Sequence, residues 1–161
     1  MSEVLRIAKV LVPVDGSECS RYAAEHAARI AAACGAELIF LHVVDEAVVD
    51  ALGHRTIDNG QRVREQLREN GHMYVRDIAR LAIEHNVVHQ EEIADGDPCA
   101  VICAAAIRHD VDLIVMGKIG RRGARRILVG SVTQRVTEFA DRPVLIITGP
   151  PAVLDKARMG G

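Results

Sequence analysis

Residues 117–132 read GKIGRRGARRILVGSV and join an apolar, strand-like run to a predicted helix. Gly117 and Gly120 can take positive φ, which would let backbone N–H groups approach an oxygen-rich ligand. Gly130 and Ser131 stand where the helix is expected to begin, and a helix start offers N–H donors and the positive end of a dipole. Positive charge comes from five side chains in the stretch: Lys118, Arg121, Arg122, Arg125 and Arg126. The pattern predicts a phosphate site. A plain strand-to-helix turn whose charges face solvent is the alternative.

The chain has the size and composition of one folded domain. Its 161 residues are 49% hydrophobic, which argues against disorder. Aromatic residues make up 2%, so few rings could stack on bases, and the formal net charge is -2. That charge gives no global attraction to nucleic acid or to an anionic membrane, and we expect neither as a partner. Residues 1–149 are expected to form the domain and residues 150–161 a C-terminal tail.

Apolar runs of strand length alternate with stretches of helical periodicity. The near-continuous apolar character of the runs indicates strands buried on both faces, as in a parallel sheet. The predicted strands are 7–14, 37–44, 87–94, 112–116 and 143–148. The predicted helices are 19–34, 61–86, 98–109 and 131–140, and residues 45–60 form a variable connection that can include a short helix. Gly71 is a weak point in the second helix, and Ser17, Asp97 and Ser131 are the expected caps.

Five strands and about four helices predict an α/β, Rossmann-like fold with a doubly wound parallel sheet. We expect the strand order 3-2-1-4-5, because right-handed crossovers and a reversal between the first and fourth strands create a crevice at the carboxyl ends. This order brings Asp15 to the loop that begins at Gly117. The last strand would be an edge, and its VLIIT run invites pairing with a second copy, so we expect a homodimer through this strand.

The four cysteines are too few for a disulfide scaffold in a chain of this length, and they suit a reducing cytoplasm. Cys34 is expected on the buried stripe of the first helix. Cys99 and Cys103 follow a His-x-Glu at residues 89–91, which faintly resembles a zinc deaminase pattern. Their spacing is one residue too long. At i and i+4 of a helix such cysteines are more often small buried side chains, so we expect no metal site.

The chain resembles the universal stress protein family over about residues 8–148. The pattern G-x2-G-x9-G-[ST] is present as Gly117, Gly120, Gly130 and Ser131, and it follows the apolar run DLIVM. Further matches are VPVDGS at residues 12–17, LHVV at 41–44 and PVL at 143–145. The resemblance implies binding of an adenine nucleotide, usually ATP, with or without Mg²⁺, by the branch of the family that keeps this loop.

Carried over by position, the resemblance implies two groups of binding residues. Those that would surround adenine and ribose are Pro13, Asp15, Val43, Met116 and Gly117. Those that would face the phosphates are Gly120, Gly130, Ser131 and Val132. Val14, Lys118 and Arg121 complete the candidate set.

Three candidate residues have a second interpretation. Many relatives carry Ser or Thr after the first glycine, so Lys118 departs from the family and either contacts phosphate or fills the site. Asp15 can contact the nucleoside, start an Asx-turn before Gly16, or do both. Ser131 can cap the helix and contact a ligand with the same hydroxyl.

The leading hypothesis is a cytoplasmic, dimeric adenine-nucleotide-binding protein of stress response or signalling, whose occupancy alters a surface for an unidentified protein partner. A slow Mg²⁺-dependent ATPase is the second hypothesis. The sequence contains no P-loop and no G-x-S-x-G elbow, and it offers no evident base in the crevice, so no catalytic residue is assigned and activity stays open. A nucleotide-free dimeric interaction module is the third.

Overall fold

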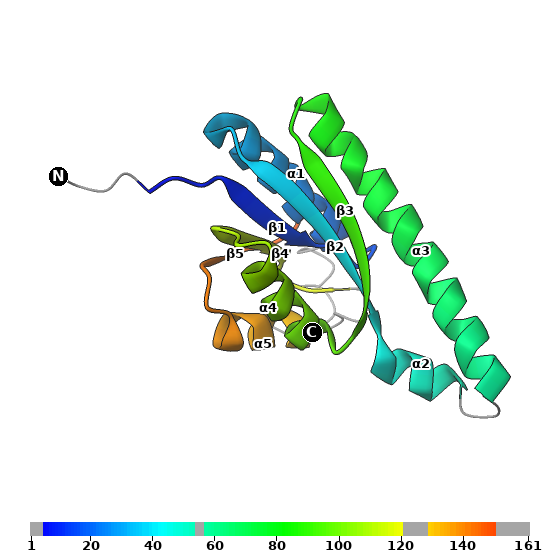
Figure 1. Cartoon of the computed structure of the whole chain (residues 1–161). Coiled ribbons are helices and arrows are strands. Elements are labelled where there is room, and N and C mark those ends of the chain that lie inside the picture. The colour runs from blue at the N-terminus through cyan, green and yellow to red at the C-terminus, as the bar shows by residue number, and fades with distance from the viewer. Residues whose placement is uncertain (1–4, 54–56, 121–128, 151–161) are drawn as a thin grey trace.

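The computed structural model describes residues 5–53, 57–120 and 129–150. Within these residues the chain forms five strands and five helices (Figure 1). The strands are β1 (Lys9–Pro13), β2 (Glu37–Asp45), β3 (His89–Gly96), β4 (Leu113–Gly117) and β5 (Val144–Ile147). The helices are α1 (Glu18–Cys34), α2 (Glu46–Gly53), α3 (Ile57–Glu84), α4 (Pro98–Arg108) and α5 (Ser131–Phe139). Apart from Pro150, the predicted tail lies outside the described residues.

All five strands form one parallel sheet in the order β3-β2-β1-β4-β5, which confirms the predicted order. The reversal falls between β1 and β4, where Val10 aligns with Leu113 and Leu11 with Ile114. Val10, Leu11 and Val12 have no exposed surface, as expected of a central parallel strand covered on both faces. The carboxyl ends of β1 and β4 therefore lie side by side at the point where the strand order reverses.

The sheet lies between two layers of helices, and each layer has its own apolar core (Figure 1). On one face, Ala27 of α1 and Val75 of α3 pack in one cluster with Phe40 of β2. On the other face, Ile102 of α4 and Val136 of α5 pack with the opposite side of the central strands. Successive residues of each strand point to opposite faces, so each buried strand serves both cores.

The connection at residues 45–60 contains the short helix that the sequence allowed, which makes five helices among the described residues where about four were expected. α2 follows β2 directly, and the Asp45 carboxylate accepts a hydrogen bond from Ala47 N–H at 2.9 Å. Val49 holds α2 to the rest of the molecule with 3% of its surface exposed. α3 begins before the predicted helix, at Ile57, and runs unbroken to Glu84.

Gly71 does not break α3, and the space where its side chain would lie is occupied by a residue of the sheet. A Cβ at this position would lie 2.3 Å from His42 Cδ2. Tyr74 packs its ring edge-on against His42, with centroids 5.5 Å apart, and the same ring covers Gly16. Gly71 therefore sets how closely α3 approaches β2.

Two predicted helix starts are confirmed. Ser17 accepts a hydrogen bond from Ser20 N–H at 3.0 Å and caps α1. Asp97 accepts one from Ala100 N–H at 2.9 Å and caps α4, with Pro98 in the first turn. Short polar side chains with extended backbone suit this position because they satisfy an N–H group that the helix leaves without a partner.

Two other local expectations are wrong. β3 begins two residues later than predicted, at His89. Asn86 takes a left-handed φ of 54° and Val87 N–H bonds back to the carbonyl of Ala82 at 2.8 Å, so these residues terminate α3 instead of starting a strand. Cys34 is exposed, because it lies in the last turn of α1, beyond the buried stripe.

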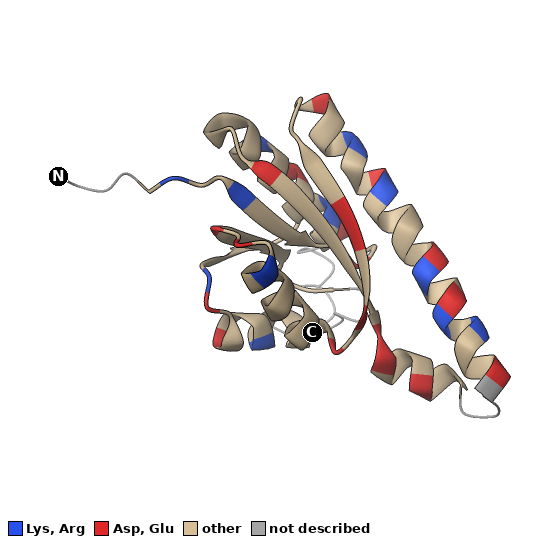
Figure 2. Cartoon of the chain, in the orientation of Figure 1, with Lys and Arg blue, Asp and Glu red and all other residues tan. Residues whose placement is uncertain are grey.

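Charged residues of both signs alternate along α3 (Figure 2). Ion pairs that join α3 to its neighbours are Arg21–Asp77 at 2.5 Å, Arg64–Glu46 at 2.8 Å and Arg68–Asp95. These side chains are a third to a half exposed, so each pair contributes at most about 1 kcal/mol. Across the described part of the chain, neither α3 nor any other helix combines the length and apolar character needed to span a bilayer.

Gly71→Ala is expected to lower the free energy of unfolding by about 1–3 kcal/mol through the collision with His42. Alanine in place of glycine normally stabilises a helix by about 1 kcal/mol. Gly60→Ala is the matched control in α3, because a Cβ there would meet nothing within 4 Å. Urea unfolding compares the two variants. Equal stabilisation by both substitutions would contradict the role given to Gly71.

Candidate functional site

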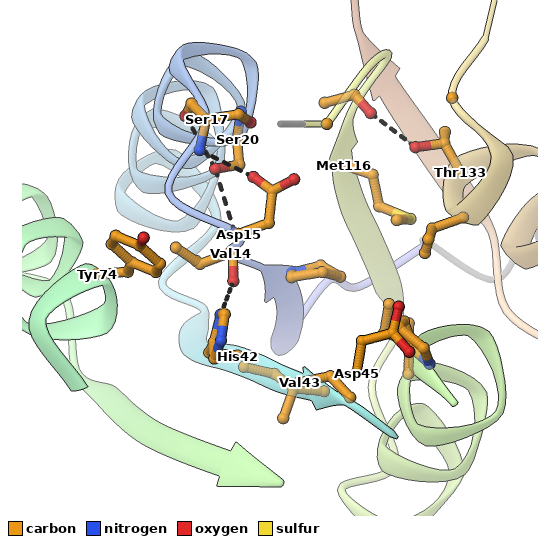
Figure 3. A pocket seen from close by; sticks show the side chains of 18 of the residues that line it. Val14, Asp15, Ser17, Ser20, His42, Val43, Asp45, Tyr74, Met116 and Thr133 are labelled. Carbon is orange, nitrogen blue, oxygen red and sulfur yellow. Dashed lines mark hydrogen bonds between the residues drawn. The ribbon is translucent and has the colours of Figure 1, made fainter. Parts of the chain in front are cut away.

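A pocket of about 680 Å³ opens at the carboxyl ends of the strands. Its lining comes from the ends of β1, β2 and β4, from the starts of α1, α4 and α5, and from α2 and α3 (Figure 3). Small-molecule sites typically enclose roughly 300–1,000 Å³, and doubly wound sheets place them where the strand order reverses. The pocket therefore has both the size and the position of a ligand site.

Figure 3 shows the turn between β1 and α1 in the middle of the view, with Val14 and Asp15 among the lining side chains. Asp15 Oδ1 accepts a hydrogen bond from Ser17 N–H at 2.9 Å, which is the Asx-turn predicted from the sequence. Gly16 takes a φ of 79°, a conformation that side chains rarely adopt, and the Tyr74 ring occupies the space where a Cβ would lie. Ser20 Oγ also lies 3.4 Å from Asp15 N–H. These bonds fix the direction of the Asp15 carboxylate.

Asp15 and Gly120 lie in contact, which confirms that the two distant turns meet across the crevice. A Cβ on Gly120 would lie 2.5 Å from Asp15 Oδ2. Gly120 also lies close to Gly130, since a Cβ on Gly130 would lie 3.5 Å from Gly120 N. The end of β1, the loop after β4 and the start of α5 thus converge at one place.

Gly117 and Gly120 do not take the positive φ that the sequence suggested, since neither is among the residues with that conformation. Gly117 allows β4 to approach the first turn of α1, where its Cβ would lie 2.8 Å from the Cys19 carbonyl carbon. Gly149 covers the same residue from another side, with a Cβ position 2.7 Å from Cys19 Sγ. Burial raises the pKa of the Cys19 thiol, although a hydrogen bond from the Ile119 backbone opposes this.

The start of α5 differs from the prediction, because Gly130 and not Ser131 is the cap residue. Gly130 has no side chain to cap the helix, and Ser131 is already the first helical residue. Gly130 N–H donates to the carbonyl of Lys118 at 2.8 Å, and Thr133 Oγ1 donates to the carbonyl of Gly117 at 2.9 Å. These bonds join α5 to the end of β4, while its first turn lines the pocket with backbone N–H groups that no side chain caps.

The structure brings ten of the twelve candidate residues to the pocket wall. They are Pro13, Val14, Asp15, Val43, Met116, Gly117, Gly120, Gly130, Ser131 and Val132. Lys118 is not part of the lining, and its backbone N–H bonds the carbonyl of Ile147 at 2.8 Å. Arg121, like the other arginines of the basic run, lies outside the described residues.

Several lining residues were missed by the sequence analysis. Leu67, Asn70 and Tyr74 of α3 reach the pocket, and their spacing of three and four residues places them on one helical face. His42 was visible as a polar residue within an apolar strand, but its role depends on the helix packed above it. Asp45 is also a lining residue. It is the last residue of β2, and α2 begins at the next residue, Glu46.

Cys99 and Cys103 are not among the lining residues of the pocket, although their chain neighbours Pro98 and Ile102 are. Burial, and then the neighbouring Cys99, raise the pKa of the Cys103 thiol to about 11. Over residues 5–53, 57–120 and 129–150, no three His, Cys, Asp or Glu side chains are grouped as a metal site would need.

The doubly wound sheet and the crevice at its reversal point define an α/β, Rossmann-like protein with a ligand pocket at the carboxyl edge. Residues 6–148 match the Universal stress protein family, and the chain belongs to that family.

Individual relatives agree with this assignment. Universal stress protein MJ0531 of Methanocaldococcus jannaschii is 37% identical, over 88% of this chain and 82% of the relative. The solved structure of MJ0577, from the same organism, has a TM-score of 0.79 at 28% identity and covers 89% of this chain and 96% of its own.

Two more distant solved structures share the fold and contain nucleotides. A family member from Arabidopsis thaliana with AMP bound has a TM-score of 0.66 at 20% identity, covering 91% of this chain and 94% of its own. A universal stress protein in complex with cAMP has a TM-score of 0.63 at 24% identity, covering 88% and 97%.

Asp15→Ala is expected to destabilise the ligand-free protein by about 1 kcal/mol, because the Asx-turn loses its acceptor. Asp15→Asn keeps an oxygen at the same place and should cost much less. Urea unfolding without nucleotide measures both variants. An equal loss in the two would show that the charge of the carboxylate, and not the hydrogen bond to Ser17, stabilises the turn.

Proposed function

We propose that the pocket binds an adenine nucleotide and that the protein acts in stress response or signalling through its bound state. One observation carries the proposal: Asp15 and Gly120 lie in contact across the crevice, beside the uncapped start of α5. A carboxylate accepts hydrogen bonds from ribose hydroxyls or amino groups, and backbone N–H groups at a helix start bind phosphate. Solved proteins of the same fold hold AMP and cAMP, so an adenine nucleotide is the first ligand to test.

The proposed roles follow the chemistry of the wall. Pro13, Val43 and Met116 offer apolar surface to the base, and Asp15 accepts from the ribose. The phosphates lie against the backbone of Gly120 and of three residues at the start of α5: Gly130, Ser131 and Val132. Val14 and Gly117 complete the wall.

The charge of the wall favours a nucleotide bound with Mg²⁺. The described lining contains two carboxylates, Asp15 and Asp45, and no Lys or Arg. A divalent cation bound to the phosphates would offset the repulsion between a triphosphate and these two carboxylates. We therefore expect Mg²⁺ to strengthen ATP binding more than AMP binding.

Gly130→Val should weaken ATP binding at least about ten-fold, or about 1.4 kcal/mol, while the fold is retained. A Cβ at this position would lie 3.4 Å from Ile119 Cα, which is tight but tolerable, and the two further methyl groups would obstruct the N–H donors of α5. Calorimetric titration with ATP and with AMP, with and without Mg²⁺, measures the effect. Gly60→Ala serves as a control outside the pocket.

Three outcomes of this titration would change the conclusion. A folded wild type that binds neither nucleotide would favour a nucleotide-free interaction module. Unchanged affinity in Gly130→Val would remove α5 from the phosphate site. Release of inorganic phosphate during the titration would indicate a slow ATPase.

We also propose that the protein is a homodimer through β5, with an unidentified protein as further partner. Ile114 N–H donates to the Pro143 carbonyl and Lys118 N–H to that of Ile147, so odd-numbered residues of β5 bond β4. The N–H and C=O groups of Val144 and Ile146 therefore point away from β4, toward the open edge of the sheet. Leu145 is 37% exposed, and Phe139 at the end of α5 is 63% exposed. Such an edge can pair with a second copy.

Leu145→Lys is expected to convert the dimer to a monomer, because a charge on the edge opposes strand pairing. Light scattering at micromolar concentration measures the mass. Met73→Lys changes an equally apolar, 62% exposed residue on α3 and should leave the dimer intact. A monomeric wild type would refute the dimer while leaving the nucleotide site untouched.

A further inference from the structure

The carbonyl group of Val14 depends on a side chain, because the backbone leaves the sheet at this point. β1 ends at Pro13, and Val14 is 3% exposed. Its N–H still donates to the Leu41 carbonyl at 2.8 Å, while its carbonyl accepts from His42 Nδ1 at 2.7 Å. A carbonyl can only accept, so Nδ1 carries the hydrogen. Without this bond a buried carbonyl would lose its protein partner, which is costly.

Helix α3 holds the His42 ring in the position that this bond requires. The ring fills the space left by Gly71, where a Cβ would lie 2.3 Å from Cδ2. Tyr74 packs edge-on against the ring, at an interplanar angle of 67°. The Tyr74 ring also lies over Gly16, where a Cβ would be 2.6 Å away. α3 therefore acts on the turn after β1 at two points. It packs against His42 of β2, which binds the Val14 carbonyl, and its own Tyr74 covers Gly16.

The same turn carries the carboxylate of the proposed ligand site. The peptide group whose carbonyl His42 binds is the one that joins Val14 to Asp15. Asp15 in turn holds Ser17 N–H and lies against Gly120. In Figure 3, His42 and Tyr74 lie on one side of Asp15, and Met116 and Thr133 on the other. A rotation of this peptide would move the carboxylate away from the loop after β4.

We propose that His42 is a positioning residue that couples α3 to the nucleotide site by fixing the Val14–Asp15 peptide. The inference rests on the proposed function and adds to it a route by which a contact made on α3 alters ligand affinity. His42 does not need to touch the nucleotide in this role. It acts through the direction of the Asp15 carboxylate.

Paired substitutions of His42 test the proposal by calorimetric titration with ATP and Mg²⁺. His42→Leu removes the donor and should weaken binding about ten-fold. His42→Asn places an amide N–H close to the former Nδ1 and should recover most of the affinity. Phe40→Leu is the control, because Phe40 lies two residues away on the same face of β2 and is fully buried. It should lower thermal stability without changing affinity.

A merely structural role predicts a different pattern, in which affinity follows thermal stability across all three variants. Equal affinity in wild type and His42→Leu, or equal losses in His42→Leu and Phe40→Leu, would overturn the coupling and leave the nucleotide site standing. Failure of the wild type to bind ATP would overturn both proposals. If His42→Leu does not fold, Gly71→Ala replaces it in the test, because the added Cβ displaces the His42 ring while the Nδ1 donor remains. Unchanged affinity in Gly71→Ala would then overturn the coupling.

Discussion

Close contacts at glycine positions hold the carboxyl edge of the sheet together. Gly120 faces the Asp15 carboxylate, Gly117 faces the first turn of α1, and Gly71 faces the His42 ring. In each pair a Cβ would lie 2.8 Å or less from its neighbour, so a side chain at any of these positions would displace that neighbour. The approach of α1, α3 and the loop after β4 to the strand ends depends on these three positions. The shape of the pocket follows from that approach.

The sequence allowed the sheet order and the meeting of two distant turns to be predicted, because both follow from element succession and the handedness of crossovers. The approach of Asp15 to Gly120 could be expected from these two rules alone. The use made of each glycine could not be predicted in the same way. Gly117 appeared as a flexible residue and Gly71 as a helix weakness, but both are defined by a partner far away in sequence. Periodicity along one segment does not contain such a contact.

The cap of α5 illustrates a second limit. Ser131 has the residue type preferred at a helix start, and it stands one position inside the helix because Gly130 N–H is bound by the carbonyl of Lys118. That bond belongs to the loop, and local preference does not outweigh it. With glycine as the cap residue, the backbone N–H groups of the first turn of α5 stay available at the pocket wall. A serine at the cap position would have bound one of these N–H groups with its hydroxyl. Recognition by main-chain groups thus has a structural origin in the loop after β4.

Helix α1 carries one cysteine near each end. Cys19 is buried and Cys34 is exposed to solvent. Cys19 is enclosed by the backbone at Gly117 and by Gly149, whereas Cys34 lies exposed beside Gly35. A thiol reagent applied to the native protein reaches Cys34 first, and its reaction with Cys19 requires β4 or the chain after β5 to separate from α1. The protein therefore contains an internal probe of how often its pocket edge opens, together with a reference group on the same helix.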